Sequence, residues 1–421
     1  MAEATAECAP VTTALSDLPA RPQPLGAFPL PTSFLLIPAG PDTQQARIEL
    51  LAGRVPPQWP DRLRGHELAL RGDLDGALAA MSGTDPVSRY NRFVIDPDGV
   101  DADALRAELG EFGVLVDLVL FTTGRSELPP ELGSSDGELA AVVLAAQATL
   151  ALGRGEHAAA VATLDRAAEL VAEIAPPLAG VLLGAAAAAA QESDGPTPAV
   201  VDRLERAVRA LGEAESLRVG RAELHLALAL ALHELAGDRP DQLNRAVPHY
   251  HSALQLVRSE DAPQVWAAAH ANLASAYLTM PMTEASDQLR MGVAVQSLRA
   301  ALTVYTRETH PEQWASAQLN LANSLVYTPS RHQGDNLVEA VELYESLLEV
   351  RSRDVDPVGR ARVLANQGNV LAHLGMFDQA KAKLYEARFI FEEFSDGESV
   401  RAVRGVLDEI ARQHQLLRSQ G

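Results

Sequence analysis

The sequence predicts an all-α protein built as an array of helical hairpins, preceded by an irregular N-terminal portion. Alanine and leucine supply most of the apolar residues and aromatic residues make up only 5%, which favours closely packed helices over a β-sandwich. Short residue strings also return at intervals of 46 to 48 positions in the C-terminal half, and such internal repetition is typical of repeat architectures. A chain of 421 residues is too long for one hydrophobic core, which fits an array.

Composition and charge limit the classes of molecule that the protein is expected to bind. With 47% hydrophobic and 22% charged residues the chain is globular rather than disordered. Lys+Arg 35 against Asp+Glu 56 gives a net charge of −21, and the two lysines are Lys381 and Lys383. Nucleic-acid affinity depends on cations that neutralise phosphates, so no nucleic-acid partner is expected. Long-range repulsion also makes a basic or apolar protein segment a better partner than an acidic one.

A single cysteine, Cys8, allows neither an internal disulfide nor a thiolate metal site. The N-terminal stretch lacks the positive charges of a signal peptide. The longest apolar run, 178–190, is 13 residues, shorter than the ~18–20 that span a bilayer. We therefore expect a cytoplasmic protein without a membrane span.

The chain divides into five predicted segments along its length. Residues 1–30 are a flexible Pro/Ala-rich lead-in, and 31–136 form an irregular, mostly helical N-terminal region with one hairpin. Residues 137–216 hold divergent hairpins, 217–395 hold clear repeats, and 396–421 form a C-terminal capping helix.

Within the N-terminal region, the apolar run from Ser33 to Pro38 fits either one strand or an extended segment. Gly65 to Met81 reads as a compact helix pair. Further helices are predicted from Thr84 and from Asp101, and the apolar stretch 112–121 is predicted as a helix buried against the first repeats.

The repeat is clearest in two tryptophan-alanine dipeptides, Trp266-Ala267 and Trp314-Ala315, which lie 48 residues apart. Each precedes the same string, which begins at Asn272 in one unit and at Asn320 in the next. A third copy begins at Asn366, and a divergent one upstream begins at His225. In each second helix small and large residues follow at i, i+4 and i+7, so that they share one face and let two helices approach closely. These residues are Ala246/Tyr250/Ala253, Ala294/Leu298/Ala301, Ala340/Tyr344/Leu347 and Ala380/Leu384/Ala387.

Helix ends support these boundaries. Asp356-Pro357 and Thr309-x-x-Glu312 with Pro311 are start signals, and Ser395-x-x-Glu398 is a capping-box candidate. The last helix carries an apolar stripe that would cover the final repeat, as the end of a repeat array requires.

This pattern resembles the tetratricopeptide repeat (TPR) family, and the last unit fits best. Counted from Ala361, the family's small and large positions hold Gly368, Leu371, Gly375, Ala380, Leu384 and Ala387. The unit also matches the family's length of about 34 residues, whereas the preceding units carry extra residues between their helices. The resemblance implies a right-handed α-solenoid whose first helices line a concave groove.

The resemblance also implies which side chains face that groove. They are Arg221, His225, Asn272, Ser275, Ser316, Asn320, Asn323, Tyr327, Arg362, Asn366, Asn369 and His373. In relatives that bind extended peptides, a recurring asparagine typically holds the ligand backbone, because a carboxamide offers both a donor and an acceptor. The alternative is that these asparagines bridge neighbouring repeats or only face water. Relatives that clasp acidic chaperone tails rely on groove lysines, which are absent here.

The sequence contains few groups of residues that are typical of a catalytic site. His249 and His251, at i and i+2, point to different sides of a helix and do not suit a shared metal. The stretch Thr122–Ser126 lacks a P-loop signature, and no nucleophile elbow, zinc-protease or dinucleotide-binding motif occurs. We therefore predict no enzyme, no catalytic residue, no metal and no cofactor. Trp266 and Trp314 are predicted to wedge between adjacent units, with a binding-anchor role as the alternative.

The first functional hypothesis is a non-enzymatic scaffold that binds an extended segment of a partner protein in the concave groove. One alternative is an accessory or assembly factor that docks on a multi-subunit (metallo)enzyme such as a hydrogenase, by analogy alone. Another is a regulatory protein that acts through self-association, since incomplete caps leave apolar helix faces.

Overall fold

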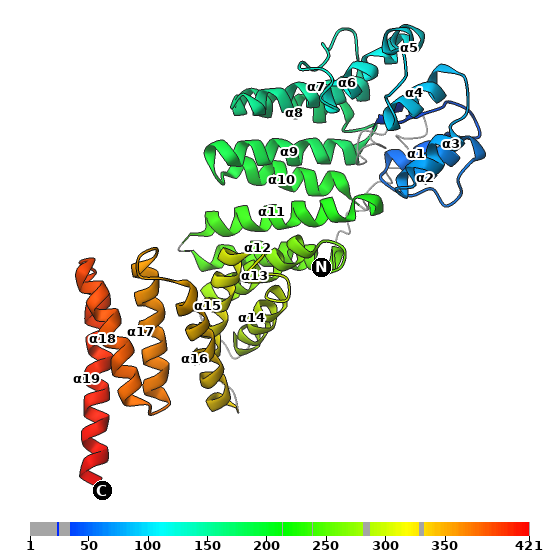
Figure 1. Ribbon diagram of the computed structural model, residues 1–421. Helices are drawn as coiled ribbons and strands as arrows, with labels where there is room; N and C mark the ends of the chain where they lie inside the picture. Colours follow the sequence, from blue (N-terminus) through cyan, green and yellow to red (C-terminus); the bar gives the residue numbers. More distant parts are fainter. Residues whose placement is uncertain are drawn as a thin grey trace, which may run out of the picture. The chain divides into compact units, whose positions relative to one another are not determined.

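The computed structural model describes residues 23–24, 34–212, 214–237, 239–280, 287–327 and 332–420 (Figure 1). The described chain is an all-α repeat fold with one pair of two-residue strands, so the predicted fold class is confirmed. It forms two compact units, Met1–Leu235 and Ala236–Gly421. Apart from residues 23–24, the predicted lead-in 1–30 lies outside the described residues.

The first unit begins with a short antiparallel strand pair. β1 (Gln23–Pro24) pairs with β2 (Leu36–Ile37), so the apolar run before Pro38 is a strand rather than an unpaired extended segment. Short helices follow: α1 (Gln44–Leu51), η3 (Asp61–Leu63), α2 (Arg64–Leu70), α3 (Leu74–Ala80), α4 (Pro86–Ile95), α5 (Ala102–Leu109), η4 (Gly110–Gly113) and α6 (Val114–Thr122).

The helices predicted from Thr84 and Asp101 form as α4 and α5. Asp85 accepts a hydrogen bond from the Ser88 amide, and Asp101 accepts from the Ala104 amide, so that each acid caps its helix. The apolar helix α6 packs against the first long helix, as the sequence predicted.

Strand β2 is held by one buried carboxamide. The Leu36 amide donates to Asn91 Oδ1 at 2.7 Å, and Asn91 Nδ2 donates to the Leu36 carbonyl at 2.8 Å. The Nε2 atom of buried His66 lies 2.9 Å from the same carbonyl. Burial lowers the pKa of His66 to about 4. Besides its pairing with β1, the strand is therefore held by side chains from α2 and α4.

Longer hairpins make up the rest of the first unit. They are built from α7 (Gly137–Gly153), α8 (His157–Val171), α9 (Pro176–Asp194) and α10 (Pro198–Leu211), followed by η5 (Glu215–Leu217) and α11 (Arg218–Ala236). Figure 1 shows α7 to α10 as successive pairs that stack on one another, and each neighbouring pair is in contact. No helix within the described residues is both long and apolar enough to cross a membrane.

Helices α9 and α10 approach closely at Gly180. A Cβ built on Gly180 would lie 2.1 Å from the Leu211 Cδ1 atom and 2.9 Å from the Ala207 carbonyl oxygen. Only glycine fits there, because the second of these atoms belongs to the backbone of α10. The pair therefore uses its own contact residues in place of the small and large pattern seen later in the chain.

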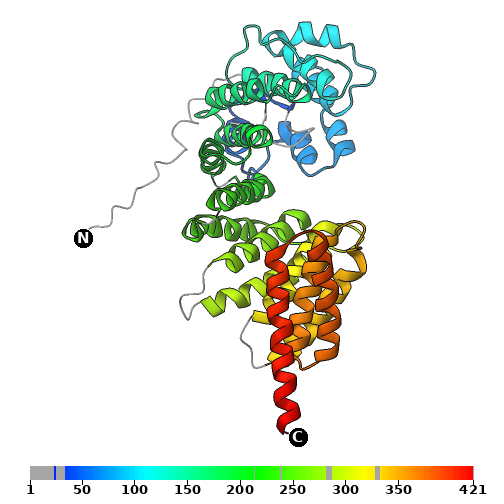
Figure 2. The same ribbon diagram turned by 90° about the vertical axis from the view of Figure 1, so that its left-hand side faces the viewer.

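The second unit consists of regular helices. They are α12 (Pro240–Leu256), α13 (Pro263–Thr279), α14 (Asp287–Ala301), α15 (Pro311–Tyr327), α16 (Gln333–Val350), α17 (Pro357–His373), α18 (Phe377–Glu393) and α19 (Gly397–Gln420). Figure 2 shows α17, α18 and α19 lying alongside one another. Their shared core includes Leu371, Leu384 and Val403, so α19 covers the last hairpin as predicted.

The α17–α18 hairpin is TPR-like in its packing. Gly368, Leu371, Ala380, Leu384 and Ala387 are all buried. A Cβ on Gly368 would lie 2.7 Å from Leu384 Cγ, which explains the small residue opposite the large one.

Two local expectations need correction. The cap of α19 is Asp396, whose carboxylate accepts hydrogen bonds from the amide and hydroxyl of Ser399, whereas Ser395 adopts a positive φ of 58°. An acid one position later therefore replaces the predicted Ser395 capping box. Some of the extra residues predicted between paired helices, around 237–242 and around 329–335, are helical, because α12 already begins at Pro240 and α16 at Gln333.

Ion pairs connect one hairpin of the second unit with the next. Arg299 reaches Glu339 40 residues later, Arg307 reaches Glu349 42 residues later, and Arg353 reaches Glu393 40 residues later. Arg299 lies on α14, and Arg307 and Arg353 lie in the loops that follow α14 and α16. In the opposite sense, Lys383 of α18 pairs back to Glu345 of α16 at 2.9 Å. Because these side chains are exposed, each pair contributes at most about 1 kcal/mol.

Both repeated tryptophans are half-buried in one cluster. Trp266 and Trp314 pack against the buried residues Ala267, Ala301 and Tyr305, and Trp314 also contacts the larger core that continues through α15 to α18. This placement between α13, α14 and α15 fits the predicted wedge between adjacent units.

Candidate functional site

The candidate site lies on the first helices of the hairpins in the second unit. Helix α13 contacts α15, α15 contacts α17, and α17 contacts α19. Each of the first three begins with a proline in its first turn, and Asp356 also accepts a hydrogen bond from the Gly359 amide to cap α17. Asn272, Asn320 and Asn366 each lie nine positions after the proline that begins their helix, so they occupy corresponding helical positions.

On α15 and α17 the predicted groove residues form two stripes that the core does not bury. They occupy positions i, i+4, i+7 and i+11, which share one face of a helix. Ser316, Tyr327, Arg362 and His373 are exposed, whereas Asn320, Asn323, Asn366 and Asn369 are half-buried. The opposite faces of both helices lie in the core.

The two stripes meet through their asparagines. Asn366 Nδ2 donates to Asn323 Oδ1 at 3.1 Å, and the hydroxyl of buried Tyr344 donates to the same oxygen at 2.6 Å. Burial raises the pKa of Tyr344, which keeps its hydroxyl a donor. One carboxamide of the predicted ladder therefore bridges neighbouring hairpins, which is the structural alternative that the sequence left open.

Other polar atoms of the ladder have no hydrogen-bond partner in the part of the chain that the structure describes. Among the described residues, Asn323 Nδ2, Asn366 Oδ1 and the side chains of Asn320 and Asn369 make no hydrogen bond to protein atoms. On α13, Asn272 Nδ2 instead donates to the Ala268 carbonyl of its own helix at 2.8 Å. The available donors and acceptors thus concentrate on α15 and α17.

An aromatic side chain stands beside these amides. Tyr327 is 71% exposed and lies one helical turn after Asn323. It is also close enough to Tyr344 to contribute to raising that hydroxyl's pKa. An exposed tyrosine next to half-buried amides combines an apolar ring with hydrogen-bonding groups, a combination that is enriched in protein interfaces.

A hollow of about 390 Å³ continues the site between α17 and α19. Asn369 and His373 line one wall, and Gly405, Val406 and Glu409 line the other. Hydrogen bonds from Arg412 and then Gln413 lower the pKa of Glu409, which favours its negatively charged form. The small residues Ala402 and Gly405 of α19 leave this space open.

Besides Asn272 on α13, three more predicted residues lie outside this cluster. Arg221 and His225 are half-buried on α11 in the first unit, and the site described here is confined to the second. Ser275 is half-buried on α13, and its carbonyl accepts a hydrogen bond from Thr279.

Sequence reasoning missed two contributors to the site. Tyr344 was identified only as a packing residue, although its hydroxyl orients Asn323. Glu409 lies on the capping helix and follows no repeat position. The available signal was its position directly before Ile410, which belongs to the apolar stripe of the last helix.

His251 lies in a contact between two helices. Its Nε2 atom lies 2.9 Å from the Tyr277 hydroxyl, which links α12 to α13. No group of three or more histidine, cysteine, aspartate or glutamate side chains suited to a metal ion occurs within the described ranges.

Comparison with known proteins yields structural similarities only. No protein-family model and no curated protein matches the chain. Among solved structures, it is similar to the apo form of RapI, with 12% identity over 84% of this chain and 97% of that one and a TM-score of 0.45. It is also similar to a Rap protein complexed with competence and sporulation factor (13% identity, 84% and 97% coverage, TM-score 0.39). A third is the P58(IPK) TPR domain (14% identity, 83% and 97% coverage, TM-score 0.28).

Proposed function

We propose that the protein is a non-enzymatic interaction scaffold that binds an extended segment of a partner protein across α15, α17 and α19. One observation carries this proposal: exposed Tyr327 stands beside a pair of asparagines whose remaining donor, Asn323 Nδ2, and acceptor, Asn366 Oδ1, bind no other described residue. A peptide group offers the matching acceptor and donor.

The same chemistry already operates inside the first unit. There the carboxamide of Asn91 pairs with both the amide and the carbonyl of Leu36 in an extended segment. This arrangement recognises a backbone without regard to its side chains. It supports the inference that asparagines on a helix of this chain suit extended peptide.

The side chains around the amides suggest the partner's character. The exposed side chains of Arg362 and His373 flank the stripe on α17, while Glu409 supplies a negative charge in the adjoining hollow. A segment with apolar side chains and a basic residue over Glu409 would complement this surface. The net charge of −21 disfavours a strongly acidic segment at long range.

The test is a pull-down with the purified full chain, in which a co-purifying protein is identified and then challenged with variants. The triple variant Asn320→Ala/Tyr327→Ala/Asn369→Ala removes groups that make no hydrogen bond to other described residues, so its melting temperature should stay near that of the wild type. We expect it to lose the partner.

The matched control is Gln296→Ala/Gln379→Ala, which removes exposed amides from the second helices α14 and α18. It should retain the partner. If the triple variant also retains the partner at wild-type affinity, groove binding is wrong.

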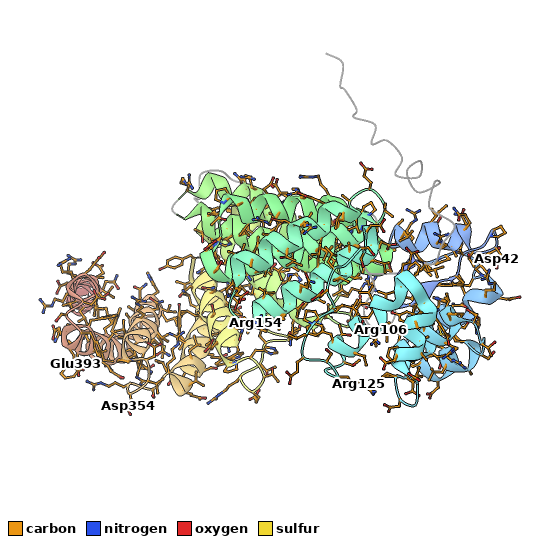
Figure 3. All side chains as sticks on the ribbon, turned by 90° about the horizontal axis from the view of Figure 1, so that it is seen from above. Asp42, Arg106, Arg125, Arg154, Asp354 and Glu393 are labelled. Carbon is orange, nitrogen blue, oxygen red and sulfur yellow. The ribbon has the colours of Figure 1, made fainter. Side chains whose placement is uncertain are left out.

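A second candidate function has its own supporting surface. On α18, Tyr385 and Phe389 are 50% and 58% exposed, and the guanidinium groups of Arg388 and Arg353 lie 5.2 Å and 5.1 Å from their ring centroids. Figure 3 places Glu393, the ion-pair partner of Arg353, at one edge of the second unit near Asp354. Exposed aromatic and arginine side chains are frequent binding hot spots.

This surface would suit an accessory or assembly factor that docks on a larger enzyme without using the groove. The same pull-down distinguishes the two functions. Loss of the partner from Tyr385→Ala/Phe389→Ala, with retention by the triple groove variant, would favour docking. Light scattering of the wild type and this double variant would show whether the surface instead mediates self-association.

A further inference from the structure

The first unit contains a second pocket, which the proposed function does not use. It lies between α9, α10 and α11 and has a volume of about 380 Å³. Its floor includes Leu204 and Leu211, each 2% exposed, and Leu224 forms part of a wall. Pockets of this size with mostly apolar walls are typical ligand sites.

The α9 wall of this pocket is apolar where it meets solvent. Val181 is 41% exposed, and Ala185 and Ala188 on the same face are also exposed. These residues belong to the run 178–190, which has no polar side chain. A helix face that borders water is ordinarily polar, and an apolar one is typical of a surface that is covered by another molecule.

The wall formed by α11 leaves the pocket open at Gly220. A Cβ built on Gly220 of α11 would meet no heavy atom within 4 Å, whereas one built on Gly184 of α9 would lie 2.6 Å from Leu224 Cδ2. The pocket is therefore closed near Gly184 and open at Gly220, and it is open enough at that end to admit a side chain.

Two polar side chains, Gln191 and Glu223, complete the lining. Glu223 is exposed at the rim and makes no hydrogen bond or ion pair with another described residue. A single carboxylate at the mouth of an apolar pocket is complementary to a cation placed next to an apolar group.

We propose that this pocket receives one large apolar side chain, of the size of phenylalanine or leucine, from a partner segment that carries a lysine or arginine beside it. The apolar group fills the space over Gly220 and the cation lies against Glu223. This site is in the first unit and is independent of the groove on α15 and α17.

The experiment uses the full chain and short peptides, with binding measured by ligand-observed NMR. The probe is acetyl-Gly-Lys-Phe-Lys-Gly-amide. Two comparison peptides replace the phenylalanine by glycine or both lysines by glutamate. We expect the glycine peptide to bind about 30-fold more weakly, the loss that follows from not burying one phenylalanine. The glutamate peptide should bind more weakly than the probe, and only the lysine peptide should lose affinity with added salt.

Variants locate the binding. Gly220→Leu fills the pocket at a point without a clash and should abolish binding of the probe, while Gly292→Leu, the same change at an exposed helical position on α14, should leave it unchanged. Glu223→Gln should weaken binding about two- to fivefold and reduce its salt dependence. The proposal is wrong if the probe does not bind the wild type, if Gly220→Leu binds it equally well, or if the glutamate peptide binds as well as the lysine peptide.

Discussion

Replacing Gly180 by alanine should destabilise the protein, although helix propensity alone would make the same change stabilising. In an open helical position, a change from glycine to alanine stabilises a helix by about 1 kcal/mol. At Gly180 the added Cβ would lie 2.1 Å from Leu211 Cδ1 and 2.9 Å from the Ala207 carbonyl oxygen. The methyl group of Leu211 can rotate away, but the Ala207 backbone moves only if α9 and α10 separate.

The magnitude follows from these two terms. Overpacking a tight interface costs about 1–3 kcal/mol, and the backbone contact places Gly180 in the upper part of that range. After the propensity gain, the net loss should be about 1–2 kcal/mol, which corresponds to a fall in melting temperature of about 3–6 °C for a unit of this size.

Differential scanning calorimetry of the full chain measures this effect. The control is Gly292→Ala, where the new Cβ meets no heavy atom within 4 Å and the melting temperature should rise slightly. If Gly180→Ala raises the melting temperature as the control does, the close approach of α9 and α10 does not exist as described.

Three further predictions concern stability. Asn91→Ala removes both hydrogen bonds to the Leu36 backbone and should cost about 2–4 kcal/mol in chemical denaturation, because buried polar groups lose their partner. Burial depresses the pKa of His66 to about 4, so its stabilising effect is complete above the ordinary value near 6.5 and is lost as the pH falls from there towards 4. The loss should reach about 3 kcal/mol in denaturant titrations across that range. Trp314→Ala should lower the melting temperature by several degrees, because the half-buried ring packs against Tyr305 and the core beyond it.

Each of these predictions has a control. The exposed Asn244→Ala should change stability little, and equal losses from Asn244→Ala and Asn91→Ala would refute the carboxamide bridge. In His66→Gln the acid-dependent loss should shrink, and an unchanged pH profile would assign the loss to other groups. If Trp314→Ala loses a partner but melts like the wild type, Trp314 is a binding anchor rather than a wedge.

The sequence predicted the hairpins best where packing follows a short local rule. In α17 and α18, Gly368 and Leu384 occupy consensus positions, and the structure places them in contact. The α9–α10 pair lies in the segment 137–216, which was predicted to hold divergent hairpins. Its contact depends on Gly180 against Ala207 and Leu211, a set of positions that the consensus does not describe.

The site was harder to predict because its contacts join distant residues. Helical spacing correctly grouped the residues of each stripe on an unburied face. The bond between Asn323 and Asn366 spans 43 residues, and that between Leu36 and Asn91 spans 55. Such pairs depend on how helices dock rather than on any local pattern. Whether the groove residues bind a ligand remains a prediction, as do the segment boundaries.

These ion pairs have a consequence for how such similar hairpins assemble in the right order. Arg299 and Arg307 pair with acids of α16, whereas at the next junction Arg353 pairs forward with Glu393 and Lys383 pairs back with Glu345, so these two junctions carry different sets of charges. A hairpin that skipped a neighbour, or exchanged with its counterpart in another copy of the chain, would face a mismatched set of charges. Repeat proteins are prone to that kind of misassembly, and weak surface pairs can discourage it without adding much to the stability of the finished array.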